Sequence, residues 1–328
     1  MASWLPSVGY GMYNSPDETA NAVVAEQIAV HSVGTIETAT DAEDFLWVHP
    51  RSWVGLPGKI VPVGFFGWPV LLALLRRLLG LWLLPWVGGL LLVSSIIPFY
   101  LSLRKWFGTG ASAVGVLIAF SFPTMIVYAN RGLFSNGPVL AFGLWTFWLL
   151  LRRGERGWNA RLAFVTGLLA GITLSIRPIE AIWIVPWWAW AWAYHANRET
   201  WNARRFRLYV SSYTFLFGFL LGVVPSMLLA WNAYGSPFVI GYWLRETSPV
   251  VRDAAISASP AAISLFPFGF HPRNAWWNVR SFLFWLTWPW VALIVFAVFR
   301  RIGSWRKMTR PFDREHLPVV CAGWTVAW

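Results

Sequence analysis

Two adjacent carboxylates, Asp17 and Glu18, open a stretch that reads NSPDETANAVVAEQ over residues 14–27. A carboxylate accepts a proton from an attacking hydroxyl or amine, so the pair is a candidate for general-base catalysis. The same stretch also has a structural interpretation. Ser15, Pro16 and Glu18 fall where an N-cap, an N1 proline and the acid of a capping box fall. The capping box accounts for Glu18 and leaves Asp17 as the stronger catalytic candidate.

The composition is that of an integral membrane protein. Hydrophobic residues make up 57% of the 328 residues, charged residues only 12%, and there are 26 tryptophans. Soluble domains are about half apolar and a quarter charged. The single cysteine, Cys321, excludes an internal disulfide and a cysteine-ligated metal. No glycine-rich phosphate loop is present, which argues against direct use of ATP or a nucleotide sugar.

Long runs with few charges predict an all-α, polytopic transmembrane helix bundle with about seven full spans. An eighth apolar run begins at Leu317 and is cut short at Trp328. The run at 64–75 is too short to cross a bilayer, so we expect it to be interfacial or re-entrant. The expected spans are 80–103, 111–130, 133–151, 162–176, 178–194, 208–235 and 281–299.

The charge distribution predicts which loops share a face of the membrane. Four loops, at 104–105, 152–161, 197–207 and 300–315, carry 16 Lys and Arg against 4 Asp and Glu, which is the whole net charge of +12. By the positive-inside rule this basic face is cytoplasmic, so the charge reflects topology and not nucleic-acid binding. The chain is then a multi-pass protein of the plasma (inner) membrane.

This topology divides the chain into an extracytoplasmic first loop, residues 1–79, and a transmembrane bundle, residues 80–328. We expect the first loop to carry short amphipathic and interfacial helices, and the bundle to hold a long outer loop at 236–280. Export of residues 1–60 without a preceding apolar segment leads us to expect that the sequence is a fragment that lacks a first helix.

Several stretches together resemble the C-type (GT-C) polytopic glycosyltransferases, in particular the family 39-like branch of protein O-mannosyltransferases and aminoarabinose transferases. They are SPDETANAVVAEQIAVHSVGTIE, HPRSW, GKIVPVGFFGWPVLLALL, LSIRPIEAIWIVPWW, NAYGSPFVIGYW and FPFGFHPRNAWWN. The first, acidic motif is the most specific of them. Members of the family normally have a helix before the acidic loop and further spans after the region where this chain ends.

The resemblance implies inverting transfer of a sugar from a polyprenyl-phosphate donor to a lipid, glycan or protein acceptor on the extracytoplasmic face, with no nucleic-acid partner. It makes Asp17 the base, with Glu18 beside it, and Lys59 a phosphate-binding residue. Lys59 also fits an ordinary interfacial lysine, and Arg177 an interfacial anchor. The remaining substrate-binding candidates, which also fit solvated loops, are His49, Arg51, Tyr242, Arg245, His271 and Arg273, with Arg177 and Lys59.

The sequence contains no cofactor motif, and a divalent cation is the one cofactor left open. The acidic cluster Asp41–Asp44 is its candidate ligand set, although it lacks the spacing of an oxygen-ligand loop. Two other functions stay open. One is a polytopic transporter or lipid flippase, and the other is a non-catalytic subunit that keeps a GT-C-like fold.

Overall fold

The computed structural model describes residues 15–37, 52–56, 58–156, 159–196, 201–239, 276, 277 and 280. The chain divides into two compact units. Unit 1 comprises Met1–Phe99 and Val127–Pro267, and unit 2 comprises Tyr100–Ile126 and Phe268–Trp328. The described residues are mostly helical, as expected for a chain of this composition.

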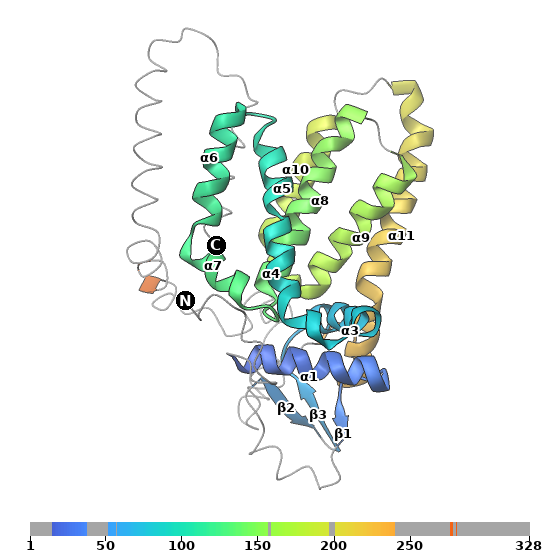
Figure 1. Ribbon diagram of the computed structural model, residues 1–328. Helices are drawn as coiled ribbons and strands as arrows, with labels where there is room; N and C mark the ends of the chain where they lie inside the picture. The colour runs from blue at the N-terminus through green and yellow to red at the C-terminus, as the bar shows by residue number, and fades with distance from the viewer. Residues whose placement is uncertain are drawn as a thin grey trace. The chain divides into compact units, whose positions relative to one another are not determined.

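Figure 1 shows the elements in chain order. Unit 1 begins with α1 (Pro16–His31), β1 (Ile36–Glu37), β2 (Trp53–Leu56), β3 (Lys59–Pro62) and α3 (Gly67–Leu79). It continues with the 3₁₀ turn η2 (Leu81–Leu83), α4 (Leu84–Ser94), α8 (Asn136–Arg156), α9 (Ala160–Ile176), the 3₁₀ turn η3 (Pro178–Glu180), α10 (Ala181–Ala196) and α11 (Trp201–Tyr234). Helix α6 (Thr109–Phe120) belongs to unit 2, while α5 (Ile96–Leu103) and α7 (Pro123–Asn130) each contain a unit boundary.

Helix α1 begins with the predicted N-cap serine and N1 proline. Ser15 is the N-cap in an extended conformation, and its Oγ accepts a hydrogen bond from the Glu18 N–H at 3.3 Å. Pro16 occupies the first helical position, where its missing N–H costs nothing. The helix ends at Ser32, whose φ of 61° is the left-handed conformation typical of helix C-termini.

The expectation of helices alone in the first loop is corrected by a three-stranded antiparallel sheet with strand order β1-β3-β2. Strand β2 pairs with β3 from Trp53↔Pro62 to Leu56↔Lys59. The sequence WVGLPGKIVP carries the signals of a hairpin: β-branched and aromatic residues on both sides of a Pro-Gly turn, with Gly58 at φ +74°. The sheet shares a core with Val24 of α1 and Ala233 of α11.

Two described helical segments are long and apolar enough to cross a membrane, Leu81–Leu103 and Ser212–Tyr234, and both match expected spans. The number rises to four if each of two bent pairs is one span. One pair, Ala160–Ile176 with Pro178–Trp192, bends by 115°, although the sequence predicted two separate spans there. Helix α3 has 13 residues, about 20 Å, which is shorter than the bilayer core and agrees with an interfacial segment. The spans expected at 281–299 and after Leu317 lie outside the described residues.

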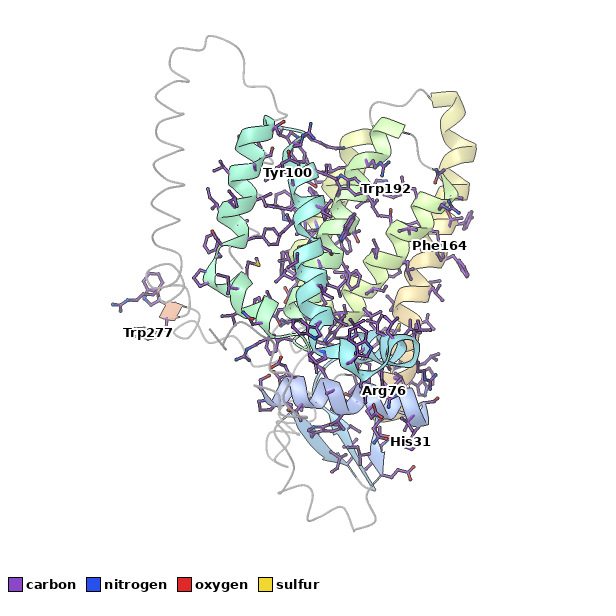
Figure 2. The ribbon with its side chains drawn as sticks, in the orientation of Figure 1. His31, Arg76, Tyr100, Phe164, Trp192 and Trp277 are labelled. Atoms are coloured by element: carbon purple, nitrogen blue, oxygen red, sulfur yellow. The ribbon has the colours of Figure 1, made fainter. Side chains whose placement is uncertain are left out.

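Helices α9 and α11 pack backbone to backbone through two pairs of glycines spaced four residues apart. A Cβ on Gly171 would lie 2.2 Å from the Phe219 carbonyl oxygen, and one on Gly218 would lie 2.2 Å from the Phe164 carbonyl oxygen. Small residues permit this approach in membrane helices. The Phe164 ring, labelled in Figure 2, also lies 6.0 Å from the Phe217 ring of α11. The two helices therefore cannot accept a side chain at these glycines without separating.

Gly171→Ala tests this contact. Alanine favours an isolated helix by about 1 kcal/mol over glycine, but here it overpacks a backbone contact, so we expect a net loss of about 1–3 kcal/mol. The measurement is tryptophan-fluorescence unfolding of the detergent-purified protein. Gly143→Ala in α8 is the matched control, because its Cβ would meet side-chain atoms only at 3.8 Å. Equal stability of the two variants would contradict the packing.

Candidate functional site

The turn formed by residues 131–135, with Asn136 beginning α8, is the structural centre of the site. The Leu133 carbonyl accepts hydrogen bonds from Asn21 Nδ2 and Trp68 Nε1, both at 2.9 Å. The Gly132 carbonyl accepts the Gly88 N–H of α4 at 3.1 Å. Leu133 is 1% exposed. The 131–136 turn thus joins α1, α3 and α4 through its backbone.

Glu18 is buried against this turn. The residue is 3% exposed, and its carboxylate accepts hydrogen bonds from the Leu133 backbone and the Ser15 side chain. Its Oε2 atom is buried without a hydrogen-bond partner. Burial raises the pKa of this carboxyl, and the nearby Arg131 guanidinium and the two hydrogen bonds only partly offset that effect. Glu18 therefore connects α1 to the 131–136 turn as well as standing next to the N-cap.

Asp17, the residue directly before Glu18 on the same helix, is exposed. Its Oδ1 accepts a hydrogen bond from the hydroxyl of Ser52, the residue directly before β2. A helix turns by about 100° per residue, so two adjacent side chains face different surroundings. The two carboxylates consequently have different environments: Glu18 is buried in the protein, and Asp17 is exposed to solvent.

Arg177 contacts the end of the 131–136 turn. Its Nη1 donates to Asn136 Oδ1 at 2.6 Å, and its Nε lies 3.3 Å from Glu180 Oε1. Trp183 Nε1 donates to the second carboxylate oxygen of Glu180 at 2.6 Å. Arg177 is partly exposed, with 28% of its side-chain surface accessible. A second guanidinium, Arg131, lies 5.7 Å from the centre of the Phe134 ring.

Lys59 occupies the opposite end of the β2–β3 hairpin from Ser52. Ladder pairing places Lys59 opposite Leu56, four residues from Ser52, which is about 13 Å along a strand. Its Nζ donates to the Asn232 carbonyl near the end of α11 at 3.1 Å. The structure therefore brings Arg177, but not Lys59, to the turn that contacts α1.

The other substrate-binding candidates, His49, Arg51, Tyr242, Arg245, His271 and Arg273, lie outside the described residues. So does the Asp41–Asp44 cluster proposed for a cation. Within the described part of the chain, no group of three or more His, Cys, Asp or Glu residues is arranged to hold a metal ion.

Sequence reasoning missed Ser52, Arg131 and Asn136. Ser52 stands beside Arg51 in the HPRSW motif, where a hydroxyl carries no signal of its own. Arg131 and Asn136 had a usable signal, because they are polar residues in a short turn between two apolar runs on the face expected to hold Asp17.

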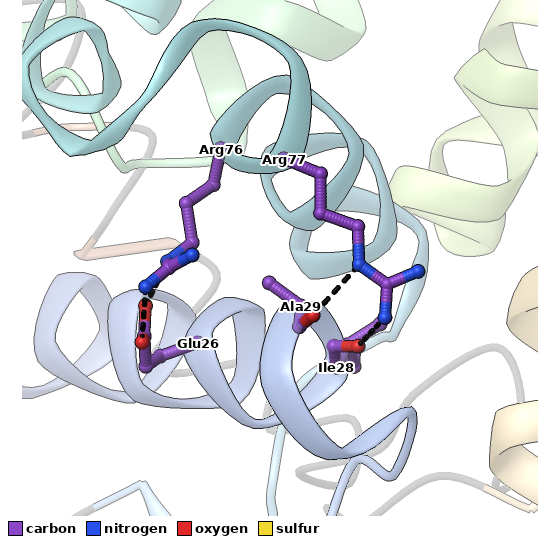
Figure 3. A network of polar contacts seen from close by, with 5 residues as sticks. All are labelled: Glu26, Ile28, Ala29, Arg76 and Arg77. Carbon is purple, nitrogen blue, oxygen red and sulfur yellow. Dashed lines mark hydrogen bonds and ion pairs between the residues drawn. The ribbon is translucent and has the colours of Figure 1, made fainter.

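Two arginines of α3 also contact the C-terminal half of α1 (Figure 3). Arg76 forms an ion pair with Glu26. Arg77 donates from Nε to the Ala29 carbonyl at 2.7 Å and from Nη2 to the Ile28 carbonyl at 3.1 Å. The Ile28 carbonyl also accepts the N–H of the C-cap residue Ser32, and both carbonyls lie in the last turn of α1, where the helix dipole favours a cation.

These contacts connect both the first turn of α1, where Asp17 is exposed, and Arg177 to the 131–136 turn, which also carries Arg131. The carboxylate is suited to accept a proton, and arginines are suited to bind phosphate through paired N–H donors. The basic ends of α8 and α9, at Arg152 and Arg161, are the opposite ends of those helices. The described residues thus include a proton acceptor at Asp17 and two candidate phosphate-binding cations at Arg131 and Arg177.

No protein-family model, curated protein or solved structure matches this chain.

Glu18→Gln tests the buried carboxylate. Because the folded-state pKa of Glu18 is raised, its effect on stability is most favourable below its ordinary pKa of 4.5 and is lost as the pH rises through the raised value. We expect the free energy of unfolding of the wild type to fall across that window and that of Glu18→Gln to lack this fall. Unfolding in detergent between pH 4 and 8 measures the difference. Glu37→Gln, at an exposed residue, is the control.

Arg77→Met tests the contact between α3 and the end of α1. The variant keeps an apolar stem but loses the donors, so we expect a loss of about 0.5–1.5 kcal/mol, limited by the exposure of Arg77. Hydrogen exchange should quicken in the last turn of α1. Arg161→Met, on an exposed arginine of α9, should leave that exchange unchanged. Unaltered exchange in Arg77→Met would show that the contact does not hold the helix.

Proposed function

We propose that this chain is a membrane glycosyltransferase that moves a sugar from a polyprenyl-phosphate donor to a lipid, glycan or protein acceptor. The observation that carries the proposal is the exposed Asp17 carboxylate, held by Ser52 at the start of α1 beside the 131–136 turn. The resemblance of the acidic motif to the C-type transferases supports the same reading.

In the proposed reaction the acceptor oxygen or nitrogen attacks the anomeric carbon of the sugar. A bond forms between them while the bond from that carbon to the phosphate oxygen breaks, and the electron pair leaves with the polyprenyl phosphate. The acceptor's proton passes to Asp17, and the configuration of the sugar inverts. Asp17 acts at the start of a helix, so correct placement of the acceptor supplies much of the rate.

The leaving phosphate needs cations, and we assign this role to Arg177 and Arg131. Arg177 keeps N–H donors beyond those used by Asn136 and Glu180, and Arg131 stands beside the buried Glu18. Guanidinium groups stabilise charge that develops on a leaving phosphate. Lys59 is a weaker candidate than the sequence implied, because it lies at the far end of the hairpin and contacts Asn232.

The topology proposed with this function is a GT-C-like bundle of about seven spans in the plasma (inner) membrane. The site would then face the extracytoplasmic side, because the first loop and the 131–136 turn share the end of unit 1 opposite Arg152 and Arg161.

A lipid flippase is a second candidate, favoured by the two helix pairs that bend by 65° and 115°. Broken helices are typical of transporters. A flippase would move the polyprenyl-phosphate sugar without cleaving it, so release of free polyprenyl phosphate separates the two functions.

Asp17→Asn tests the proposed chemistry. Asparagine preserves the helix start but is no base, so we expect transfer to fall by about 10²–10⁴-fold. The measurement is release of polyprenyl phosphate from polyprenyl-phosphate mannose and polyprenyl-phosphate aminoarabinose by the full chain in lipid nanodiscs, with lipid and peptide acceptors. Glu37→Gln removes an exposed carboxylate elsewhere and should retain full activity.

Full transfer by Asp17→Asn would refute the assignment of the base. Absence of sugar release by a folded wild-type chain with either donor, together with movement of the intact donor across vesicles, would favour the flippase. Absence of both activities would favour the non-catalytic subunit.

A further inference from the structure

Ser52 has an unusual backbone conformation. Its φ is 71°, and it is one of two non-glycine residues with positive φ in the described part of the chain. The other, Ser32, is explained as the left-handed cap at the end of α1. Ser52 ends no helix. It is 6% exposed and immediately precedes β2.

Ser52 connects two elements that are far apart in sequence. Its hydroxyl donates a hydrogen bond to Oδ1 of Asp17, 35 residues earlier. Its carbonyl accepts the Val63 N–H at 2.9 Å, which closes the open end of the β2–β3 hairpin. The sheet therefore fixes the Ser52 backbone, and Ser52 in turn holds the carboxylate.

Glycine would adopt the backbone conformation of Ser52 at a lower energetic cost. Positive φ costs an L-residue conformational energy that glycine does not incur, and such strain persists where the surrounding structure uses it. The serine hydroxyl donates a hydrogen bond to the exposed carboxylate of Asp17. This hydrogen bond explains why the position is serine and not glycine.

We propose that Ser52 is a positioning residue for Asp17, an inference that rests on the proposed transferase function. By occupying Oδ1, the hydroxyl turns Oδ2 toward the acceptor and leaves that oxygen free to take its proton.

The test compares Ser52→Gly with Ser52→Ala. Both lack the hydroxyl, but only glycine suits the positive φ, so Ser52→Gly should unfold at a higher temperature than Ser52→Ala. Both should lose about 10- to 100-fold in kcat, because the base is misplaced. Their KM for the donor should stay close to that of the wild type, because neither variant changes a residue assigned to bind the phosphate.

Ser32→Gly is the matched control. It makes the same substitution at the second positive-φ serine, whose hydroxyl oxygen accepts from Arg77 Nη2 at 3.2 Å and not from the site. It should leave both kcat and KM unchanged. Wild-type kcat in Ser52→Gly, with Asp17→Asn inactive, would overturn the role of Ser52 and leave the transferase standing.

A second measurement does not depend on the function. A double-mutant cycle of Ser52→Ala and Asp17→Ala, followed by thermal unfolding, measures the coupling between the two side chains. Ser52→Ala should lower the unfolding temperature less in the Asp17→Ala background than in the wild type, because the hydrogen bond is already absent there. Equal losses in the two backgrounds would overturn the inference even if no transfer is found, whereas coupled losses without transfer would refute only the proposed function.

Discussion

The structure of the site depends on the hydrogen bonds of one turn between two apolar helices. A backbone N–H or C=O group that is buried away from water must form a hydrogen bond. In the 131–136 turn, three such groups bond to other elements of the protein. Its Leu133 carbonyl is satisfied by Asn21 of α1 and Trp68 of α3, its Leu133 N–H by Glu18, and its Gly132 carbonyl by Gly88 of α4. Since these bonds are directional, they set the position of the first turn of α1 as well as its contact with the bundle.

This constraint explains why two adjacent acids have different environments. Glu18 faces the turn, where its carboxylate accepts the Leu133 N–H and loses contact with water. Asp17 then faces outward, where a single hydroxyl from Ser52 limits its rotation. The energetic cost of burying Glu18 is the reason for its raised pKa. Helical geometry and the hydrogen bond of the Leu133 N–H thus explain why Glu18 is buried and the adjacent Asp17 is exposed.

Local features were predictable from the sequence, whereas contacts between distant backbone groups were not. Ser15 and Pro16 predict the start of a helix, because capping depends on residues within one turn. The hairpin was not predicted although WVGLPGKIVP carries its signals, because the apolar runs that follow it in the sequence predict helices. No residue type marks the Leu133 carbonyl as the partner of Asn21, 112 residues away. The helical character of the chain and the start of α1 were therefore predictable from the sequence, whereas the contact between Ser52 and Asp17 was not.

Helix α3 shows how such a site can stand at the edge of a membrane. One face buries Trp68, Leu72 and Ala73, and its last turns expose Leu74 and Leu78 at 52% and 69%. The arginines between these leucines, at 76 and 77, contact α1, whose first turn carries Asp17. A helix too short to span thus presents apolar side chains suited to lipid and cations that hold a polar helix. A lipid-linked sugar has the same division, an apolar chain and a polar head, so a site for it requires a boundary of this kind.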